Sequence, residues 1–257
     1  EMAERRAEFL REKTGTTLNH VRRASFDPAV LPGNIENFIG VAQVPIGLAG
    51  PLRINGEHAQ GDFYVPLATT EGTLVASYSR GMRVLSECGG VTATVVKRSM
   101  QRAPVFMFAT AREARDFGEW LTQRFDDVKQ AAEATTRSGR LVEIEQYAIG
   151  NLLYLRFNYT TGDAAGQNMT GKATHAACEW IHATHPARPK YMLSGSIDTD
   201  KKHSAINTLR TRGRRVVAEA VIKNDVLQRL MRVDTRTLFK ARQVSNAGAL
   251  LAGTAYN

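Results

Sequence analysis

Two runs of alternating apolar and polar residues, 141–147 and 152–159, constrain the fold of this chain most strongly. Alternation with a period of two is typical of strands that bury one face. The runs are joined at Gly150-Asn151, a pair whose composition favours a tight hairpin turn. The sequence therefore predicts two neighbouring antiparallel strands in the middle of the chain.

Strand and helix patterns flank this hairpin in a definite order. A short apolar strand is predicted at 105–108 and a charged helix at 111–129. After the hairpin come a helix at 169–182 and a last short strand at 191–193. The order β-α-β-β-α-β is that of the ferredoxin-like split unit. We expect residues 102–191 to form this unit as a small domain.

The remaining sequence predicts a larger domain into which the small one is inserted. Residues 36–101 and 192–257 are expected to form this large mixed domain, so the fold class is α+β. Residues 1–35 are expected to form an N-terminal helical segment.

Two helices are expected outside the insert. The first spans residues 4–13 as an amphipathic helix with Phe9 and Leu10 facing inward. The second begins near Thr70, which would cap it, and ends before Gly89-Gly90.

Bulk composition favours a globular protein outside membranes. The 257 residues are 43% hydrophobic, yet no apolar run approaches the roughly twenty residues that cross a bilayer. The first residues are charged and lack the apolar core of a signal peptide. Cys88 and Cys178 are too few for a disulfide framework. A cytoplasmic protein without membrane contact is the prediction.

A formal net charge of +9 predicts attraction to polyanions. The densest cluster is at 210–215, with four arginines, which we interpret as a solvated turn at a helix end. No helix-turn-helix, zinc or aromatic RNA-binding signature accompanies it, so we expect no nucleic-acid partner. The histidines lack metal-ligand company, so no metal site is predicted.

Three segments in the chain combine residue types that suit catalysis. Ala68-Thr69-Thr70-Glu71-Gly72 places a carboxylate where a helix is predicted to begin. Residues 162–169 form a small-residue loop running into a helix, which suits a phosphate but lacks the spacing of a Rossmann site. Residues 198–202 read Asp-Thr-Asp-Lys-Lys. Taken singly, these segments are also consistent with a helix-capping acid, an ordinary glycine loop and a solvated charge run.

Together and in this order, the three segments resemble 3-hydroxy-3-methylglutaryl-coenzyme A (HMG-CoA) reductases of the NADPH-dependent class I type. Residues 36–40, residues 43–52 and Leu193-Ser194-Gly195 add to the resemblance, which covers nearly the whole chain. It implies an oxidoreductase that uses NADPH twice to convert HMG-CoA into mevalonate and free coenzyme A. It also implies a homodimer or higher homo-oligomer, with residues 36–40 in the dimer contact.

The resemblance assigns roles to particular residues. It implies that Lys201 stabilises the oxyanion and that Glu71 donates a proton to the aldehyde oxygen. The implied substrate-binding residues are Arg102, Ser194, Asp200 and Lys202. The implied residues of the dinucleotide-binding small domain are Thr136, Arg137, Asp163, Ala165, Gly166, Gln167, Asn168 and Met169.

The chain departs from the family pattern in several places. Ala165 and Gln167 stand where the family usually has methionine, Ser138 replaces an aromatic residue, and Val244 replaces a lysine. The family's catalytic aspartate and histidine would follow residue 257, so we expect the chain to be a fragment of a reductase. The alternatives are a relative that binds acyl-CoA or nucleotide without reduction, and a basic nucleic-acid-binding domain.

Overall fold

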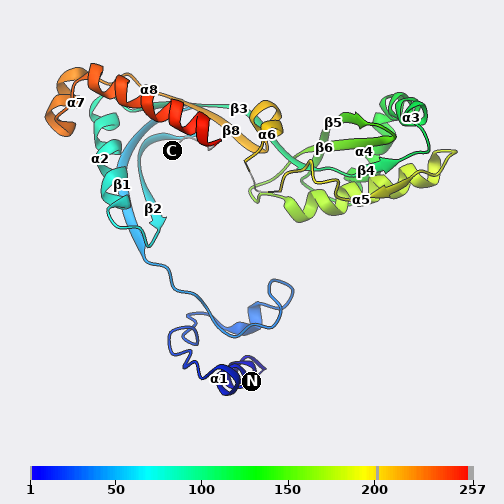
Figure 1. Ribbon diagram of the computed structural model, residues 1–257, viewed down its shortest axis with the longest axis horizontal. Coiled ribbons are helices and arrows are strands. Elements are labelled where there is room, and N and C mark those ends of the chain that lie inside the picture. The colour runs from blue at the N-terminus through cyan, green and yellow to red at the C-terminus, as the bar shows by residue number, and fades with distance from the viewer. Residues whose placement is uncertain (1, 201–202, 254–257) are drawn as a thin grey trace. The chain divides into compact units, whose positions relative to one another are not determined.

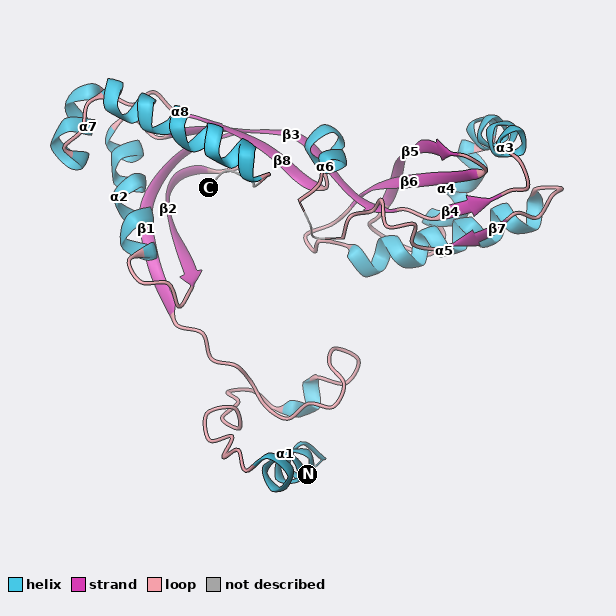
Figure 2. Ribbon diagram, viewed as in Figure 1, coloured by secondary structure: helices cyan, strands magenta, loops and turns pink. Residues whose placement is uncertain are grey.

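The computed structural model describes residues 2–200 and 203–253. It has a mixed α+β fold (Figures 1 and 2). Its residues form two compact units. The first comprises the chain up to Ile54 with Gln60–Val91 and Ala220–Asp234, and the second comprises Asn55–Ala59, Thr92–Glu219 and the residues from Thr235 onward.

The first unit begins with α1 (Met2–Thr14), which buries Ala7. The expectation that Phe9 faces inward is wrong, because this side chain is 60% exposed. Two residues along a helix correspond to about 200° of rotation, so burying Ala7 directs Phe9 outward. Gly15 ends the helix with φ +71°, and its N–H donates to the carbonyl of Arg11 at 2.8 Å.

Strands and helices follow α1 in the first unit. A short 3-10 helix, η1 (Pro28–Val30), precedes β1 (Ile46–Gly56) and β2 (Gln60–Ala68), which are neighbours in the sheet. Helix α2 (Leu74–Glu87) ends where Gly90 N–H donates to the carbonyl of Leu85 at 2.8 Å, as its Gly89-Gly90 signal predicts. Helix α7 (Asn224–Met231) packs on α2, where Arg229 pairs with Glu87 at 2.5 Å.

The second unit contains the predicted β-α-β-β-α-β order. Its strands are β4 (Val105–Met107), β5 (Arg140–Ile149), β6 (Leu152–Thr160) and β7 (Lys190–Met192). They pair antiparallel in the order β5-β6-β4-β7, with Val105 opposite both Tyr154 and Met192. Figure 1 shows the helices between residues 111 and 184 beside this sheet.

The first helix of this unit differs from the expectation. The predicted single helix at 111–129 is two helices, α3 (Ala111–Gln123) and α4 (Phe125–Glu133), interrupted at Arg124. Thr110 caps α3 by accepting from Glu113 N–H at 3.2 Å. The interruption allows Val128 of α4 to be fully buried together with Leu121 of α3.

Strand β6 separates an apolar face of the sheet from a polar one. Alternate residues Leu153, Leu155, Phe157 and Tyr159 are buried in a core with α3, α4 and α5 (Gln167–Thr184). Ala173 and Ala177 on α5 are small and fully buried, which lets this helix approach the sheet closely. The intervening residues Arg156 and Asn158 point to the other face, and they are also buried.

Strand β3 (Val91–Arg102) enters the second unit and meets two partners. Its residues 92–99 pair with β8 (Gly213–Glu219), and residues 100–102 pair with β6. Helices α6 (Ala205–Arg210) and α8 (Thr235–Ala252) complete the described elements. Within residues 2–200 and 203–253, no helix combines the length and apolar character needed to cross a membrane.

Candidate functional site

Residues 194–200 and 203–212 lie on the polar face of the small sheet. Gly195 lies directly on this face, since a Cβ added there would come within 2.8 Å of the Tyr154 ring and 3.2 Å of Val105 Cβ. Its N–H donates to the carbonyl of Ala103 at 2.7 Å. The segment that carries the Asp-Thr-Asp motif is therefore packed against the sheet at its start.

The backbone of this segment is strained. Ser196, Thr199 and Asp200 have φ values of +69°, +60° and +40°, in the left-handed region that side chains other than glycine rarely adopt. Asn207 at the start of α6 donates from Nδ2 to Thr199 Oγ1 at 2.6 Å. Such strain persists only where surrounding contacts over-determine the conformation. Asn207 supplies one of these contacts.

Arg156 of β6 holds the Asn207 side chain in place. Its side chain is 0% exposed, and Nη2 donates to Asn207 Oδ1 at 2.9 Å and to the carbonyl of Thr211 at 3.0 Å. Nη1 lies 3.6 Å from Glu145 Oε2, which balances the buried charge. A continuous polar chain thus runs from β5 through Arg156 to Thr199, the residue before Asp200.

Two predicted substrate residues meet at a carboxylate that sequence analysis did not assign to the site. Asp198 Oδ2 accepts from Ser194 Oγ at 3.3 Å and lies 3.4 Å from Arg102 Nη1. The Asp198 side chain is only 3% exposed. The signal available in the sequence was its place in the Asp-Thr-Asp motif, two residues before Asp200.

Asp200 joins the two sets of predicted residues. Gln167, assigned to the cofactor, donates from Nε2 to Asp200 Oδ1, and Arg212 Nη2 lies 3.6 Å from the same oxygen. The solvated-turn interpretation is wrong for Arg212, whose side chain is 8% exposed and donates to the carbonyl of Gln101 at 3.0 Å. Burial lowers the pKa of Arg212, while Asp198 and Asp200 oppose that shift.

The loop 161–166 ends at Gly166, the residue immediately before α5. Gly166 has φ +81°, and a Cβ there would meet Thr161 Cγ2 at 2.5 Å, so glycine is required on both grounds. Among residues 2–200 and 203–253, no side chain caps α5 at this end. The first N–H groups of the helix are therefore available to an anion.

The turn at 136–139 lies beside this helix start. Thr136 Oγ1 accepts from Gly139 N–H at 3.0 Å, and a Cβ on Gly139 would come within 2.4 Å of Met169 Sδ. Predicted cofactor residues from two distant stretches are thus brought together. Arg137 is exposed on the turn, while the side chains of Asp163, Ala165 and Asn168 are exposed around the helix start.

Glu71 belongs to the first unit and does not lie in a helical turn. Helix α2 begins at Leu74 after Thr73, so the expectation of a helix starting near Thr70 with Thr70 as cap is wrong. Thr69 Oγ1 accepts the Glu71 N–H at 2.9 Å, which holds a turn before the helix. The carboxylate is exposed. Lys201 and Lys202 lie outside the described residues.

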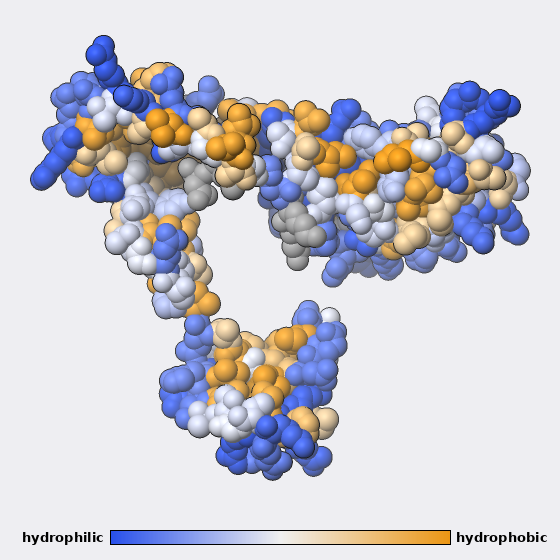
Figure 3. All heavy atoms as spheres, in the orientation of Figure 1, coloured by the Kyte–Doolittle hydropathy of each residue, from blue (hydrophilic) through white to orange (hydrophobic). Residues whose placement is uncertain are grey.

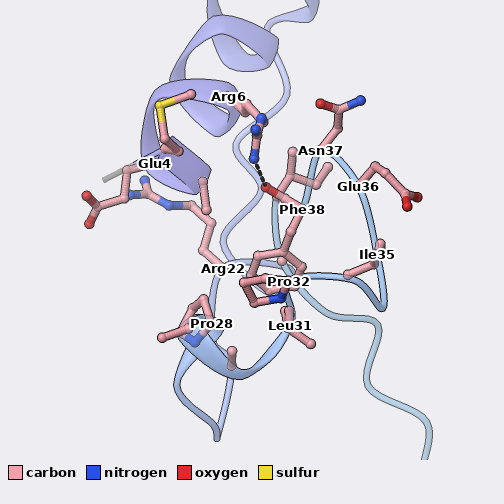
Figure 4. A pocket seen from close by; sticks show the side chains of 16 residues that line it. Glu4, Arg6, Arg22, Pro28, Leu31, Pro32, Ile35, Glu36, Asn37 and Phe38 are labelled. Carbon is pink, nitrogen blue, oxygen red and sulfur yellow. Dashed lines mark hydrogen bonds between the residues drawn. The ribbon is translucent and has the colours of Figure 1, made fainter.

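The N-terminal part of the first unit contains a hollow of about 750 Å³ (Figure 4). It lies between α1, η1 and residues 35–40, and Arg6 Nη1 donates to the carbonyl of Phe38 across it at 3.4 Å. Gly40 closes the segment with φ +156°, where any Cβ would lie 2.1 Å from the carbonyl oxygen of Val21. Figure 4 shows Glu4 and Glu36 at opposite sides of the hollow, so its charged groups do not converge.

Comparison with known proteins identifies the family. The model of the family described as hydroxymethylglutaryl-coenzyme A reductase matches residues 2–257. The chain belongs to this family. The resemblance inferred from the sequence motifs is confirmed.

Similar reductases come from archaea and a plant. The 3-hydroxy-3-methylglutaryl-coenzyme A reductase of Pyrococcus abyssi is 41% identical over 97% of this chain and 62% of its own length. The reductase of Aeropyrum pernix is 43% identical over 96% of this chain and 59% of its own length. The reductase of Zea mays is 36% identical over 96% of this chain and 43% of its own length. The chain thus spans about three fifths of the length of its archaeal relatives.

A solved structure of the reductase from Streptococcus pneumoniae has the same fold. It superimposes with a TM-score of 0.62 at 18% sequence identity, covering 88% of this chain and 59% of that one. At this identity the match supports the mixed α+β fold of this reductase-family chain.

Replacing Arg156 by methionine should lower the free energy of unfolding by about 3 kcal/mol, because Glu145 would remain buried without its cation. Urea unfolding followed by circular dichroism measures this change. Replacing Arg115, an exposed residue of α3 paired with its neighbour Asp116, serves as the control and should cost less than about 1 kcal/mol.

A double variant sharpens this test. Adding Glu145→Leu to Arg156→Met should recover part of the loss, because an apolar pair then replaces a broken buried ion pair. A loss for Arg156→Met no larger than that for Arg115→Met would contradict a central role of Arg156.

Proposed function

We propose that the protein reduces HMG-CoA to mevalonate with two molecules of NADPH, releasing free coenzyme A. The observation that carries this proposal is the hydrogen bond between Gln167 and Asp200. It joins the loop assigned to the dinucleotide to the motif that contains Lys201. Family membership over residues 2–257 supports the same chemistry.

The reaction determines what the protein must supply. Each HMG-CoA consumes two hydrides and two protons, and the thioester carbon becomes a primary alcohol while the C–S bond breaks. NADPH, when bound, supplies the hydrides. Lys201 stabilises negative charge on the carbonyl oxygen, and Glu71 delivers a proton to the aldehyde oxygen.

The start of α5 fits a dinucleotide. Its uncapped N–H groups and the positive end of the helix dipole attract a pyrophosphate, and Gly166 keeps the approach free of side chains. We assign Asp163, Ala165, Asn168 and Met169 to the same site. A reductase from Streptococcus pneumoniae has been described bound to NADPH, which supports this choice of cofactor.

The domain assignment follows from the same proposal. The ferredoxin-like unit at 102–191 would be the dinucleotide-binding small domain. Residues 36–101 and 192–257 would form the large domain for HMG-CoA, after the segment 1–35. The glutaryl end of the substrate would bind at Ser194 and Arg102, which Asp198 holds together. We assign Asp200 and Lys202 to the same substrate.

We further propose that the active protein is a homodimer that works in the cytoplasm. The resemblance of residues 36–40 to a dimer segment supports this assembly. Apolar side chains gather on the N-terminal part (Figure 3), where Val30, Ile35 and Val44 are each at least half exposed. Two free cysteines, Cys88 and Cys178, are consistent with a reducing compartment.

Lys201→Ala should lower turnover on the order of a hundred- to a thousandfold, because an oxyanion loses its main stabilising charge. The rate of NADPH oxidation in the presence of HMG-CoA measures this. Lys190→Ala, which removes an exposed lysine from β7, is the control and should leave the rate unchanged. Near-normal turnover of the Lys201→Ala protein would show that Lys201 is not part of the mechanism. If the unaltered protein bound these ligands without any turnover, the result would favour a non-catalytic relative of the family.

Arg137→Ala should raise the Michaelis constant for NADPH about tenfold and leave that for NADH nearly unchanged, because only NADPH carries the extra phosphate. Steady-state kinetics with both cofactors provide the measurement. Arg112→Ala on α3 gives the same charge change at another exposed position. Equal effects of Arg137→Ala on the two cofactors would show that Arg137 does not read the phosphate.

A shared active site can be tested by mixing inactive variants. If Glu71 of one chain acts with the dinucleotide loop of its neighbour, refolding Glu71→Gln together with Gly166→Ala should restore about one quarter of the sites. The NADPH oxidation rate of the mixture, compared with that of each variant alone, measures the recovery. A fully active monomer in sedimentation at assay concentration would exclude the shared site.

A further inference from the structure

Two pairs of like charges face each other across the ladder between β3 and β8. Lys97 is opposite Arg215, and Arg98 is opposite Arg214. Residues directly opposite in an antiparallel pair have Cβ atoms about 5 Å apart, and like charges there are destabilising. Successive residues point to opposite faces, so each face of the ladder carries one such pair.

The pair on one face is compensated within the protein. Lys97 Nζ lies 3.8 Å from Glu143 Oε2, and Arg215 Nη1 donates to the carbonyl of Thr208 at 3.2 Å. This face needs no further partner.

The pair on the other face lacks such compensation. Arg98 donates from Nη2 to the carbonyls of Thr161 and Gly162, the second at 2.8 Å, and so holds the start of the loop 161–166. The Arg214 side chain is exposed, and in the part of the chain that the structure describes it makes no hydrogen bond or ion pair. No carboxylate among these described residues pairs with either guanidinium. Two positive charges are thus left side by side.

A cavity of about 370 Å³ lies at this pair. It is bounded by residues 98–100 of β3, by the loop 161–165 and by residues 213–214 of β8. Asp163 is the one carboxylate of this lining, and it forms no ion pair with Arg98 or Arg214 within the described residues. The volume falls in the range of small-molecule sites.

The cavity and the turn at 136–139 both adjoin the same loop. A Cβ on Gly162 would lie 3.8 Å from Ser138, the residue after Arg137. The carbonyl of Gly162 accepts from Arg98. The loop assigned to the dinucleotide is therefore accompanied by basic residues from two separate parts of the chain.

We propose that Arg98 and Arg214 form a binding site for a phosphoryl group of an adenine nucleotide ligand. The proposal rests on the proposed function, since NADPH and HMG-CoA are the nucleotides of that reaction. An anionic phosphoryl group between the two guanidinium groups accepts charge-assisted hydrogen bonds from both and offsets their repulsion. The phosphoryl group has three sources: the pyrophosphate, the extra phosphate of NADPH, and the phosphate on the ribose of coenzyme A.

Arg214→Gln tests the site because it removes one charge and leaves the Arg98 contacts to the loop intact. Arg215→Gln is the matched control, with the same change one residue further on and on the opposite face. Isothermal titration of both variants with NADPH, NADH, coenzyme A and dephospho-coenzyme A should show about tenfold weaker binding in Arg214→Gln only.

The pattern of weakening identifies the source. Equal weakening for NADPH and NADH indicates the pyrophosphate, weakening for NADPH alone indicates its extra phosphate, and weakening for coenzyme A but not for dephospho-coenzyme A indicates the ribose phosphate. Affinities unchanged for all four ligands, or weakened equally by Arg215→Gln, would overturn the proposal.

Two further measurements separate this inference from the proposed function. If the unaltered protein binds neither NADPH nor coenzyme A, the proposed function fails, and inorganic pyrophosphate then serves as the probe of the cavity. Pyrophosphate binding lost in Arg214→Gln and kept in Arg215→Gln supports the site, and equal binding by all three proteins overturns it.

Without ligand, Arg214→Gln should also melt at a higher temperature than the unaltered protein, because the repulsion between Arg98 and Arg214 is gone. A lower melting temperature would contradict that repulsion.

Discussion

The contacts of the buried Arg156 guanidinium are the interactions on which the rest of the second unit depends. A fully buried cation is costly unless it is paired and hydrogen-bonded. Arg156 is paired with Glu145 and donates to Asn207 and to the carbonyl of Thr211, while its Nε and Nη1 have no hydrogen-bond partner among the described residues. These partners come from β5, α6 and the approach to β8. The Arg156 side chain of β6 therefore connects segments that are far apart in the sequence, on the face of the sheet opposite to α3, α4 and α5.

This arrangement explains how a strained backbone segment is held in place. Ser196, Thr199 and Asp200 have positive φ values. Asn207, which is fixed by Arg156, donates a hydrogen bond to Thr199 and so stabilises this conformation. Arg102 and Ser194 converge on Asp198 in the same segment, and Gln167 reaches Asp200 from the start of α5. Residues that we propose for substrate and for cofactor thus contact one segment, 194–200. Under the proposed function, this would help to align the two ligands for hydride transfer.

Much of the fold could be predicted because its signals are local. The alternation at 141–159 and the flanking apolar patterns are sufficient for the strand order β5-β6-β4-β7, since a hairpin and two crossover helices leave few arrangements. The errors concern contacts that local patterns do not report. The Phe9 side chain is exposed and the Arg212 side chain is buried, because side-chain burial depends on which residues from elsewhere in the chain cover it. Helix α2 begins only after Thr73, because the position of a helix start depends on which groups bond the preceding backbone.

The candidate site divides in the same way. The sequence by itself determined the family and the candidate residues, because motifs such as Ala-Thr-Thr-Glu-Gly and Asp-Lys-Lys are contiguous and keep their order along the chain. Only the tertiary structure decided that Asp198 joins Arg102 to Ser194, that Arg156 supports Thr199, and that Arg98 faces Arg214. These pairs are separated by tens of residues or more. Their proximity follows from strand register and from the burial of charge, which no local pattern encodes.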